Sequence, residues 1–182
     1  MKIINTKIEG LVIIEPSVFS DDRGYFFEPY NKSLFDLKIN KTNFIQDNES
    51  KSSRGVLRGF HFQKPPYDQA KLVRCIKGEV LDVAVDLRKE SGSFGKYEKV
   101  VLSEINKRQL FIPRGFAHAF LVLSKEAIFS YKVDNYYKPE YDSGIIWDDN
   151  KLNIDWNYPK KQLIISKKDK NLSSFNSLNS PF

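Results

Sequence analysis

The stretch GVLRGFHFQKPPYDQAKLVRC, residues 55–75, decides the fold class of this chain. Two alternating runs, 58–63 and 71–76, flank the turn-forming segment Pro65-Pro66-Tyr67-Asp68. Alternation with a period of two is typical of strands that bury one face, and proline can neither vary φ freely nor donate to a strand ladder. The stretch therefore predicts two strands of a sheet that are joined by a turn.

Arg58 and His61 stand in the first of these strands, and we expect both to face one cavity. Residues of equal parity project to the same face of a strand, but these two differ in parity. They can share a cavity only if the strand bulges at Gly59 or if they lie at the mouth of a barrel, and glycine inside a strand often marks a bulge. This pattern indicates a basic β cavity for an anionic small molecule.

The remaining sequence predicts a mainly β chain. Turn signals recur at the spacing expected of an all-β sandwich or barrel. A short helix is expected at 31–38, capped by Asn31, and the alternation at 78–88 is the cleanest in the chain. The other expected strands are 3–14 (a pair broken at Glu9-Gly10), 43–49, 100–102, 109–112, 117–123 and 127–133.

One domain over residues 1–182, a single β barrel or jelly roll, accounts for this organisation. The chain of 182 residues is long enough for one core, and it contains neither an internal repeat nor a linker between two domains. Its end, 171–182, is rich in serine and asparagine. This segment is expected to be either a loose tail or a stretch docked by Phe175 and Phe182.

The composition narrows the classes of function. A net charge of +6 favours anionic partners, but no basic helix, RNP-like motif or zinc-finger pattern supports nucleic acid. No run approaches the roughly 18 apolar residues of a membrane span, and no N-terminal signal peptide is recognisable. The single cysteine, Cys75, suits core packing and a reducing compartment. We therefore expect a cytoplasmic protein with neither a membrane nor a nucleic-acid partner.

Four residues stand out as candidates for chemistry, although each also has an ordinary structural interpretation. His61 and His118 are the only histidines, and a lone strand histidine is often merely hydrogen-bonded in place. Tyr131 fits core packing, and the spacing of Asp169 assigns it no partner. A catalytic metal needs about three protein ligands, and Phe62-Gln63 follows His61 where a second histidine would be expected. We therefore expect no metal.

The ordered motifs resemble those of the dTDP-4-dehydrorhamnose 3,5-epimerase family, sugar-nucleotide epimerases of the cupin superfamily. The resemblance runs nearly from end to end, and many motifs in order are far more specific than any one alone. The motifs are DRGYFFE (22–28), QDN (46–48), GVLRGFHFQ (55–63), QAKLVR (69–74), DVAVDLR (82–88), IPRGFAH (112–118), YK (131–132) and SKKD (166–169).

The resemblance implies a cupin-like jelly-roll barrel (a double-stranded β-helix) with a few short helices. It also implies a homodimer with exchanged N-terminal strands, no metal and no organic cofactor. The implied substrate is dTDP-4-dehydro-6-deoxy-D-glucose, inverted at C3 and C5. By analogy His61 is the general base, Asp169 its orienting partner and Tyr131 the acid, while Lys71 stabilises charge on the C4 oxygen. The matching substrate-binding positions are Arg23, Glu28, Gln46, Asp47, Asn48, Arg58, Lys71, His118, Tyr137, Asp142 and Lys168.

Three departures from the family pattern bear on the choice of sugar. Asp142 stands where the family pattern leads us to expect a glutamate that contacts substrate, one methylene longer. Phe60 replaces the usual leucine before His61, and residues 91–94 read Ser-Gly-Ser-Phe instead of Ser-Pro-Thr-Phe. The expected base, acid and cation are unchanged, so these departures affect the identity of the sugar more than the reaction.

Three other functions remain as alternatives. A sister enzyme that inverts only C3 or only C5 would use the same base and cation, so the sequence separates it poorly. A non-catalytic binding module for sugar nucleotides would bind ligand without solvent exchange. A metal-dependent cupin oxygenase would hold a stoichiometric ion at His61 and His118.

Overall fold

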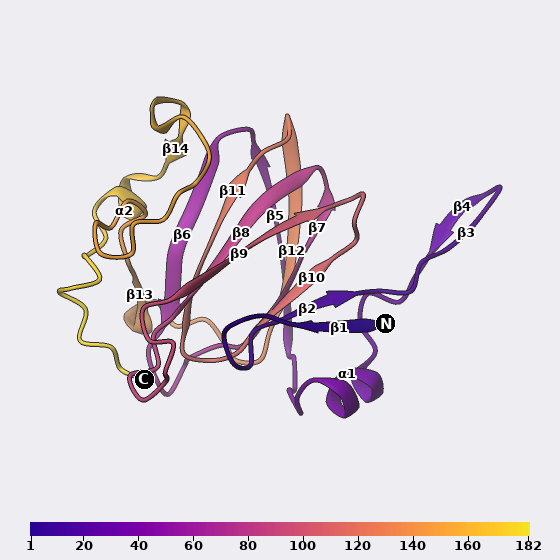
Figure 1. Ribbon diagram of the computed structural model, residues 1–182, viewed down its shortest axis with the longest axis horizontal. Coiled ribbons are helices and arrows are strands. Elements are labelled where there is room, and N and C mark those ends of the chain that lie inside the picture. The colour runs from indigo at the N-terminus through magenta and orange to yellow at the C-terminus, as the bar shows by residue number, and fades with distance from the viewer.

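Two six-stranded sheets face each other and enclose the interior of a barrel in the computed structural model, which describes residues 1–182 (Figure 1). One sheet has the order β1-β2-β10-β7-β12-β5. The other has the order β13-β6-β11-β8-β9, with β14 pairing β6. A separate hairpin, β3–β4, projects from the body of the molecule (Figure 1). The protein is therefore mainly β, as predicted.

The elements have the following bounds. The strands are β1 (Lys2–Asn5), β2 (Val12–Glu15), β3 (Phe19–Asp21), β4 (Gly24–Phe26), β5 (Gln46–Ser53), β6 (Val56–Gln63), β7 (Lys71–Lys77), β8 (Glu79–Asp86), β9 (Tyr97–Ser103), β10 (Gln109–Ile112), β11 (Phe116–Val122), β12 (Glu126–Val133), β13 (Asp142–Gly144) and β14 (Ile164–Ile165). The helices are α1 (Lys32–Lys38), α2 (Lys167–Lys170) and two 3₁₀ turns, Pro139–Tyr141 and Lys160–Gln162. None of the helices has the length and the apolar sequence of a membrane-spanning segment.

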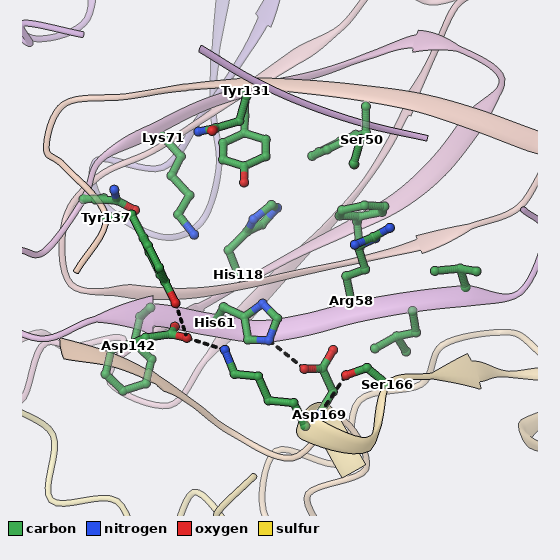
Figure 2. A pocket seen from close by; sticks show the side chains of 18 of the residues that line it. Ser50, Arg58, His61, Lys71, His118, Tyr131, Tyr137, Asp142, Ser166 and Asp169 are labelled. Atoms are coloured by element: carbon green, nitrogen blue, oxygen red, sulfur yellow. Dashed lines mark hydrogen bonds and ion pairs between the residues drawn. The ribbon is translucent and has the colours of Figure 1, made fainter. Parts of the chain in front are cut away.

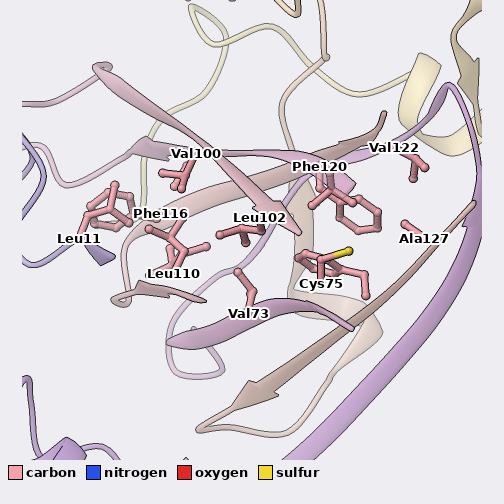
Figure 3. Close-up of a cluster of buried hydrophobic side chains, with 14 of the residues drawn as sticks. Leu11, Val73, Cys75, Val100, Leu102, Leu110, Phe116, Phe120, Val122 and Ala127 are labelled. Carbon is pink, nitrogen blue, oxygen red and sulfur yellow. The ribbon is translucent and has the colours of Figure 1, made fainter. Parts of the chain in front are cut away.

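The core inside the barrel is built from the inward-facing residues of both sheets (Figure 3). Val73 of β7 and Leu110 of β10 meet Leu102 of β9 and Phe120 of β11 there. Cys75 belongs to the same cluster, and burial raises the pKa of its thiol to about 12. The predicted packing role of this cysteine is confirmed, because its side chain is buried among the apolar residues of this cluster.

Strand β8 is buried on both faces. Leu81, Val83 and Val85 share one face, as the alternation predicted, and they pack beneath the C-terminal part of the chain. The opposite face, with Val80 and Ala84, points into the barrel. The alternation predicted one buried face, and the structure shows that the other face is buried as well because it lines the interior of the barrel.

The C-terminal residues 171–182 are docked onto the barrel. Phe175 is buried, and its backbone N–H donates to Asp149 Oδ2 at 2.8 Å. The Phe182 ring packs edge-on against Phe62, with 5.8 Å between ring centroids. Of the two arrangements expected for this segment, the structure shows the docked one, because these aromatic rings cover the outer face of the sheet that contains β6.

The sequence misplaced some boundaries. Helix α1 and its Asn31 cap are as predicted, with Asn31 Oδ1 accepting from the Leu34 N–H at 3.2 Å. The strand expected at 43–49 instead spans Gln46–Ser53, because β12 pairs with it along its whole length although it lacks apolar alternation. Helix α2 was not predicted, since four residues are too few to show a helical period.

A bulge in β6 at Gly59 is confirmed. His61 pairs with His118, and Arg58 pairs with Phe120, so three residue steps on β6 match two on β11. Gly59 has a φ of +114°, a conformation that glycine adopts readily and other residues do not. The extra residue cancels the parity difference between Arg58 and His61, and both side chains therefore line the same cavity.

We expect Gly59→Ala to destabilise the fold more than Gly24→Ala does. Both glycines have positive φ, but a Cβ at Gly59 would lie 2.5 Å from the His118 carbonyl oxygen and 2.7 Å from the Ala119 Cβ, whereas Gly24 has no atom within 4 Å. Overpacking of this kind costs roughly 1–3 kcal/mol, which should appear as a difference between the two free energies of unfolding in urea titrations. Equal losses in the two variants would contradict the steric account of the bulge.

Candidate active site

A cavity of about 620 Å³ opens inside the barrel, between the two sheets. Side chains from β5, β6, β7, β11 and β12 line it, and the segments around β13 and α2 close one side (Figure 2). Most of the residues singled out in the sequence contribute to its wall. They are Gln46, Asn48, Arg58, His61, Lys71, His118, Tyr131, Tyr137, Asp142, Lys168 and Asp169.

His61 and Asp169 form a hydrogen-bonded dyad at one wall of this cavity. His61 Nε2 lies 2.8 Å from Asp169 Oδ1, and the Gly59 N–H donates to Asp169 Oδ2 at 3.2 Å. Asp169 is only 3% exposed, and its own N–H donates to Ser166 Oγ at the start of α2. Two elements distant in sequence, the β6 bulge and α2, therefore hold the imidazole in place.

The dyad has a defined protonation pattern. Burial opposes ionisation of Asp169, but hydrogen bonds from His61, Gly59 and Ser166 outweigh it and hold its pKa below the usual value. An ionised carboxylate can only accept hydrogen bonds, so the proton of neutral His61 lies on Nε2. Its Nδ1 has no protein partner and is free to accept a proton.

Tyr131 and Lys71 come from the opposite sheet, and Figure 2 shows both pointing toward the histidines. Burial raises the pKa of Tyr131, although the charge of Arg58 opposes the shift. Burial lowers the pKa of Lys71 to about 8, and the negative charges of Asp82 and Asp142 oppose that shift. At neutral pH the cavity therefore contains a neutral phenol and an ammonium group.

The mouth of the cavity carries a smaller polar cluster. The Tyr137 hydroxyl donates to Asp142 Oδ2 at 3.1 Å, and Lys168 forms an ion pair with the same carboxylate (Figure 2). This interaction raises the pKa of Lys168. Asp142, shorter than the expected glutamate, thus holds an aromatic ring and a cation together at the entrance.

Three predicted binding residues lie outside the cavity of their own chain. Arg23 is at the tip of the β3–β4 hairpin, where its side chain is 90% exposed and pairs with Asp21. Glu28 follows this hairpin and lines a different, smaller pocket. Asp47 has the outward parity of β5 and forms an ion pair with Lys132 at 2.7 Å. The structure of one chain does not bring these three side chains to the dyad.

Sequence reasoning missed several polar residues that support the site. Ser52 Oγ accepts from Arg58 Nε at 3.1 Å, and Asp82 binds the ring of His118. Ser52 has the same parity as Asn48 on β5, a signal that could have placed it on the inner face. Asp82 stands between the core residues Val80 and Ala84 on one face of β8, and a charge between two apolar residues was a readable signal as well. No group of three or more His, Cys, Asp and Glu side chains is arranged to hold a metal ion.

Comparison with known proteins agrees with this geometry. A family profile described as dTDP-4-dehydrorhamnose 3,5-epimerase matches residues 5–177. The enzyme of that name from Escherichia coli K12 is 53% identical over 180 residues, which cover 98% of this chain and 96% of the relative.

Solved structures of epimerases also match this chain. The crystal structure of dTDP-4-dehydrorhamnose 3,5-epimerase from Elizabethkingia anophelis matches with a TM-score of 0.93 at 50% identity, covering 97% of each chain. The Legionella pneumophila dTDP-6-deoxy-D-glucose-3,5-epimerase, in complex with dTDP-4-keto-L-rhamnose, matches with a TM-score of 0.94 at 45% identity, covering 98% of this chain and 94% of that one. With its cupin-like jelly roll, this chain belongs to the dTDP-4-dehydrorhamnose 3,5-epimerase family of isomerases.

Proposed function

We propose that this enzyme inverts C3 and C5 of dTDP-4-dehydro-6-deoxy-D-glucose and so forms dTDP-4-dehydro-L-rhamnose. One observation carries the proposal: a single cavity presents the free Nδ1 of His61, the Tyr131 phenol and the Lys71 ammonium from facing sheets. Both carbons adjoin the C4 ketone, so the same three groups can serve each inversion in turn. The reaction is redox-neutral and draws only on side chains of the protein.

His61 acts as the general base. Its Nδ1 takes the proton from C3 or C5, the C–H electron pair moves into the ring, and negative charge collects on the C4 oxygen as an enolate. The resulting imidazolium is stabilised by Asp169, which also keeps the ring in the reactive tautomer. The lowered pKa of Asp169 supports this role, because the carboxylate stays charged when the imidazole gains its proton.

Tyr131 returns a proton to the opposite face of the sugar. Its raised pKa keeps the phenol protonated at neutral pH, and an enolate is basic enough to take that proton. The new C–H bond forms on the face opposite the one that was broken, which inverts the carbon. The tyrosinate and the imidazolium then exchange protons with solvent before the second carbon reacts.

Lys71 stabilises the enolate. A cation near the C4 oxygen contributes most when negative charge develops there, so it accelerates proton removal instead of merely binding the ketone. Its ammonium forms no ion pair with another side chain and is free to meet the substrate oxygen. The remaining wall supplies binding groups: Arg58 and Lys168 for the diphosphate, Tyr137 for stacking on thymine, and Gln46, Asn48, His118 and Asp142 for polar contacts.

The function is tested by turnover of dTDP-4-dehydro-6-deoxy-D-glucose in D₂O, with a reductase to trap the product. We expect product that carries solvent deuterium at both C3 and C5, read by NMR, because each inverted carbon receives an exchangeable proton. Deuterium at only one carbon would identify an enzyme that inverts a single centre. Binding without deuterium incorporation would indicate a non-catalytic module.

The same assay should distinguish the roles of the base and the acid, because it measures exchange and inversion independently. His61→Ala should lower both exchange and inversion by roughly two to four decades, the range for loss of a general base. Tyr131→Phe should abolish inversion but leave exchange measurable, since His61 can return a solvent deuteron to the face it came from. Tyr97→Phe, a change outside the cavity, serves as the control. If Tyr131→Phe removes exchange as completely as His61→Ala, the assignment of acid and base is wrong.

We also propose that Arg23 and Glu28 reach the cavity of a second copy of this chain, in a homodimer that exchanges N-terminal strands. The β3–β4 hairpin extends away from its own barrel (Figure 1) and exposes Phe19 and Phe26. Exposed aromatic side chains on a projecting hairpin are typical of a surface that another protein covers. The partner would thus add a cation and a carboxylate to a site that already holds the dyad.

Mixed dimers test this arrangement. Arg23→Ala and His61→Ala chains with different affinity tags, when co-expressed, should form heterodimers with one intact site. Both defects then fall in the cavity of the His61→Ala chain, whereas the cavity of the Arg23→Ala chain has its own His61 and receives a native Arg23 from its partner. Doubly purified heterodimers should then be much more active than either mutant homodimer. Heterodimers as inactive as the two mutant homodimers would contradict the shared site. A native protein that is fully active while light scattering shows it to be a monomer would contradict it as well.

A further inference from the structure

A carboxylate lies fully buried on the barrel-facing side of β8, where its neighbours are apolar. Asp82 is 0% exposed and stands between Val80 and Ala84, two members of the interior core. Burying a charge in such surroundings is costly unless it is paired and hydrogen-bonded. Both of its oxygens lie within hydrogen-bond distance of His118 Nε2, at 3.0 and 2.9 Å, and this ring is their only hydrogen-bond partner.

The Asp82–His118 pair repeats the arrangement of the His61–Asp169 dyad. His118 lies directly opposite His61 in the ladder between β11 and β6. In both rings a carboxylate holds Nε2, and Nδ1 has no protein partner. An ionised carboxylate accepts but does not donate, so Asp82 selects the His118 tautomer with the proton on Nε2. The free Nδ1 of His118, which lines the cavity, then presents a lone pair that can accept a hydrogen bond.

Asp82 also acts on Lys71, which approaches from the opposite sheet. Lys71 has no carboxylate within ion-pair distance, and Figure 2 shows its side chain pointing toward His118, the ring that Asp82 binds. The negative charges of Asp82 and Asp142 both favour its ammonium form. Asp142 already pairs with Lys168, whereas the only partner of Asp82 is an imidazole. The charge of Asp82 is therefore the less neutralised of the two.

We propose that Asp82 is a positioning residue of the epimerase site: it fixes the His118 ring with Nδ1 free for substrate and supplies the buried negative charge opposite the Lys71 ammonium. Asp82 does not line the cavity, so it acts through these two residues and not by touching the sugar. The His118 part stands on geometry alone. The Lys71 part rests on the proposed function, in which that ammonium stabilises the enolate.

The electrostatic part predicts a shift in pH dependence. Removing a negative charge beside a partly buried lysine favours the neutral amine, so the pKa of Lys71, about 8 in the native protein, should fall. If Lys71 must be charged for turnover, we expect loss of its proton to appear in the alkaline limb of kcat/KM, which reports groups of the free enzyme. The titratable and charged groups that line the same cavity from the other elements are Arg58, His61, His118, Tyr131, Asp142 and Lys168.

Asp82→Asn tests this part, with Asp86→Asn as the matched control. Asp86 is an equally buried carboxylate on the same strand, but it binds Arg88 and two serines away from the cavity. We expect the alkaline limb to move toward lower pH by about one unit in Asp82→Asn and to stay in place in Asp86→Asn. If the alkaline limb of kcat/KM lies at the same pH in Asp82→Asn and in the native enzyme, the electrostatic role is overturned, however much activity is lost.

A measurement on the native protein covers the case in which Asp82→Asn fails to fold. The chain has only two histidines, so ¹⁵N-histidine NMR gives two imidazole signal sets, and His61→Gln identifies the one from His118. We expect neutral His118 to carry its proton on Nε2. A proton on Nδ1 would overturn the inference.

The two readouts distinguish this inference from the proposed function. A native enzyme that does not turn over the keto sugar would refute the proposed function and, with it, the role of Asp82 toward Lys71. The His118 tautomer is measured without substrate and still decides whether Asp82 positions that ring.

Discussion

The hydrogen bonds that Asp169 accepts from His61 and Gly59 are the contacts on which the site depends. They join α2, near the end of the chain, to a bulge in β6 more than a hundred residues earlier. The bulge turns Arg58 and His61 to the same face, and the carboxylate then fixes which imidazole nitrogen is free. In a strand that alternated normally, Arg58 and His61 would point to opposite sides.

Burial shifts the pKa values of two residues on the facing sheet in opposite directions. The same desolvation that raises the pKa of the Tyr131 phenol lowers that of the Lys71 ammonium, because burial always disfavours the charged form. The phenol is thus kept as a proton donor. Burial works against the charge of the lysine, and the negative charges of two buried or partly buried carboxylates, Asp82 and Asp142, favour its ammonium form. The protonation states of Tyr131 and Lys71 therefore follow from one balance between desolvation and nearby charge.

The sequence predicted those parts of the fold and of the site whose signal is local. Alternation indicated the barrel, and the parity of Arg58 and His61 called for either a bulge at Gly59 or a position at the barrel mouth, of which the structure shows the bulge. Contacts between distant segments could not be predicted from spacing, so Asp169 gained a role only through family resemblance. The polar strand Gln46–Ser53 was misplaced because its partner β12, not its own hydrophobic pattern, decides its length. Asp82 was visible as a charge on an apolar face, but its bond to His118 required coordinates.

In the proposed reaction an imidazole and a phenol flank one pyranose ring whose ketone oxygen meets an ammonium. A crystal structure of this enzyme with a bound dTDP-linked sugar tests it most directly. We expect His61 Nδ1 and Tyr131 Oη on opposite faces of the ring, with Lys71 Nζ at the C4 oxygen. A sugar that meets both groups on the same face, or that lies outside the space between the two sheets, would contradict it.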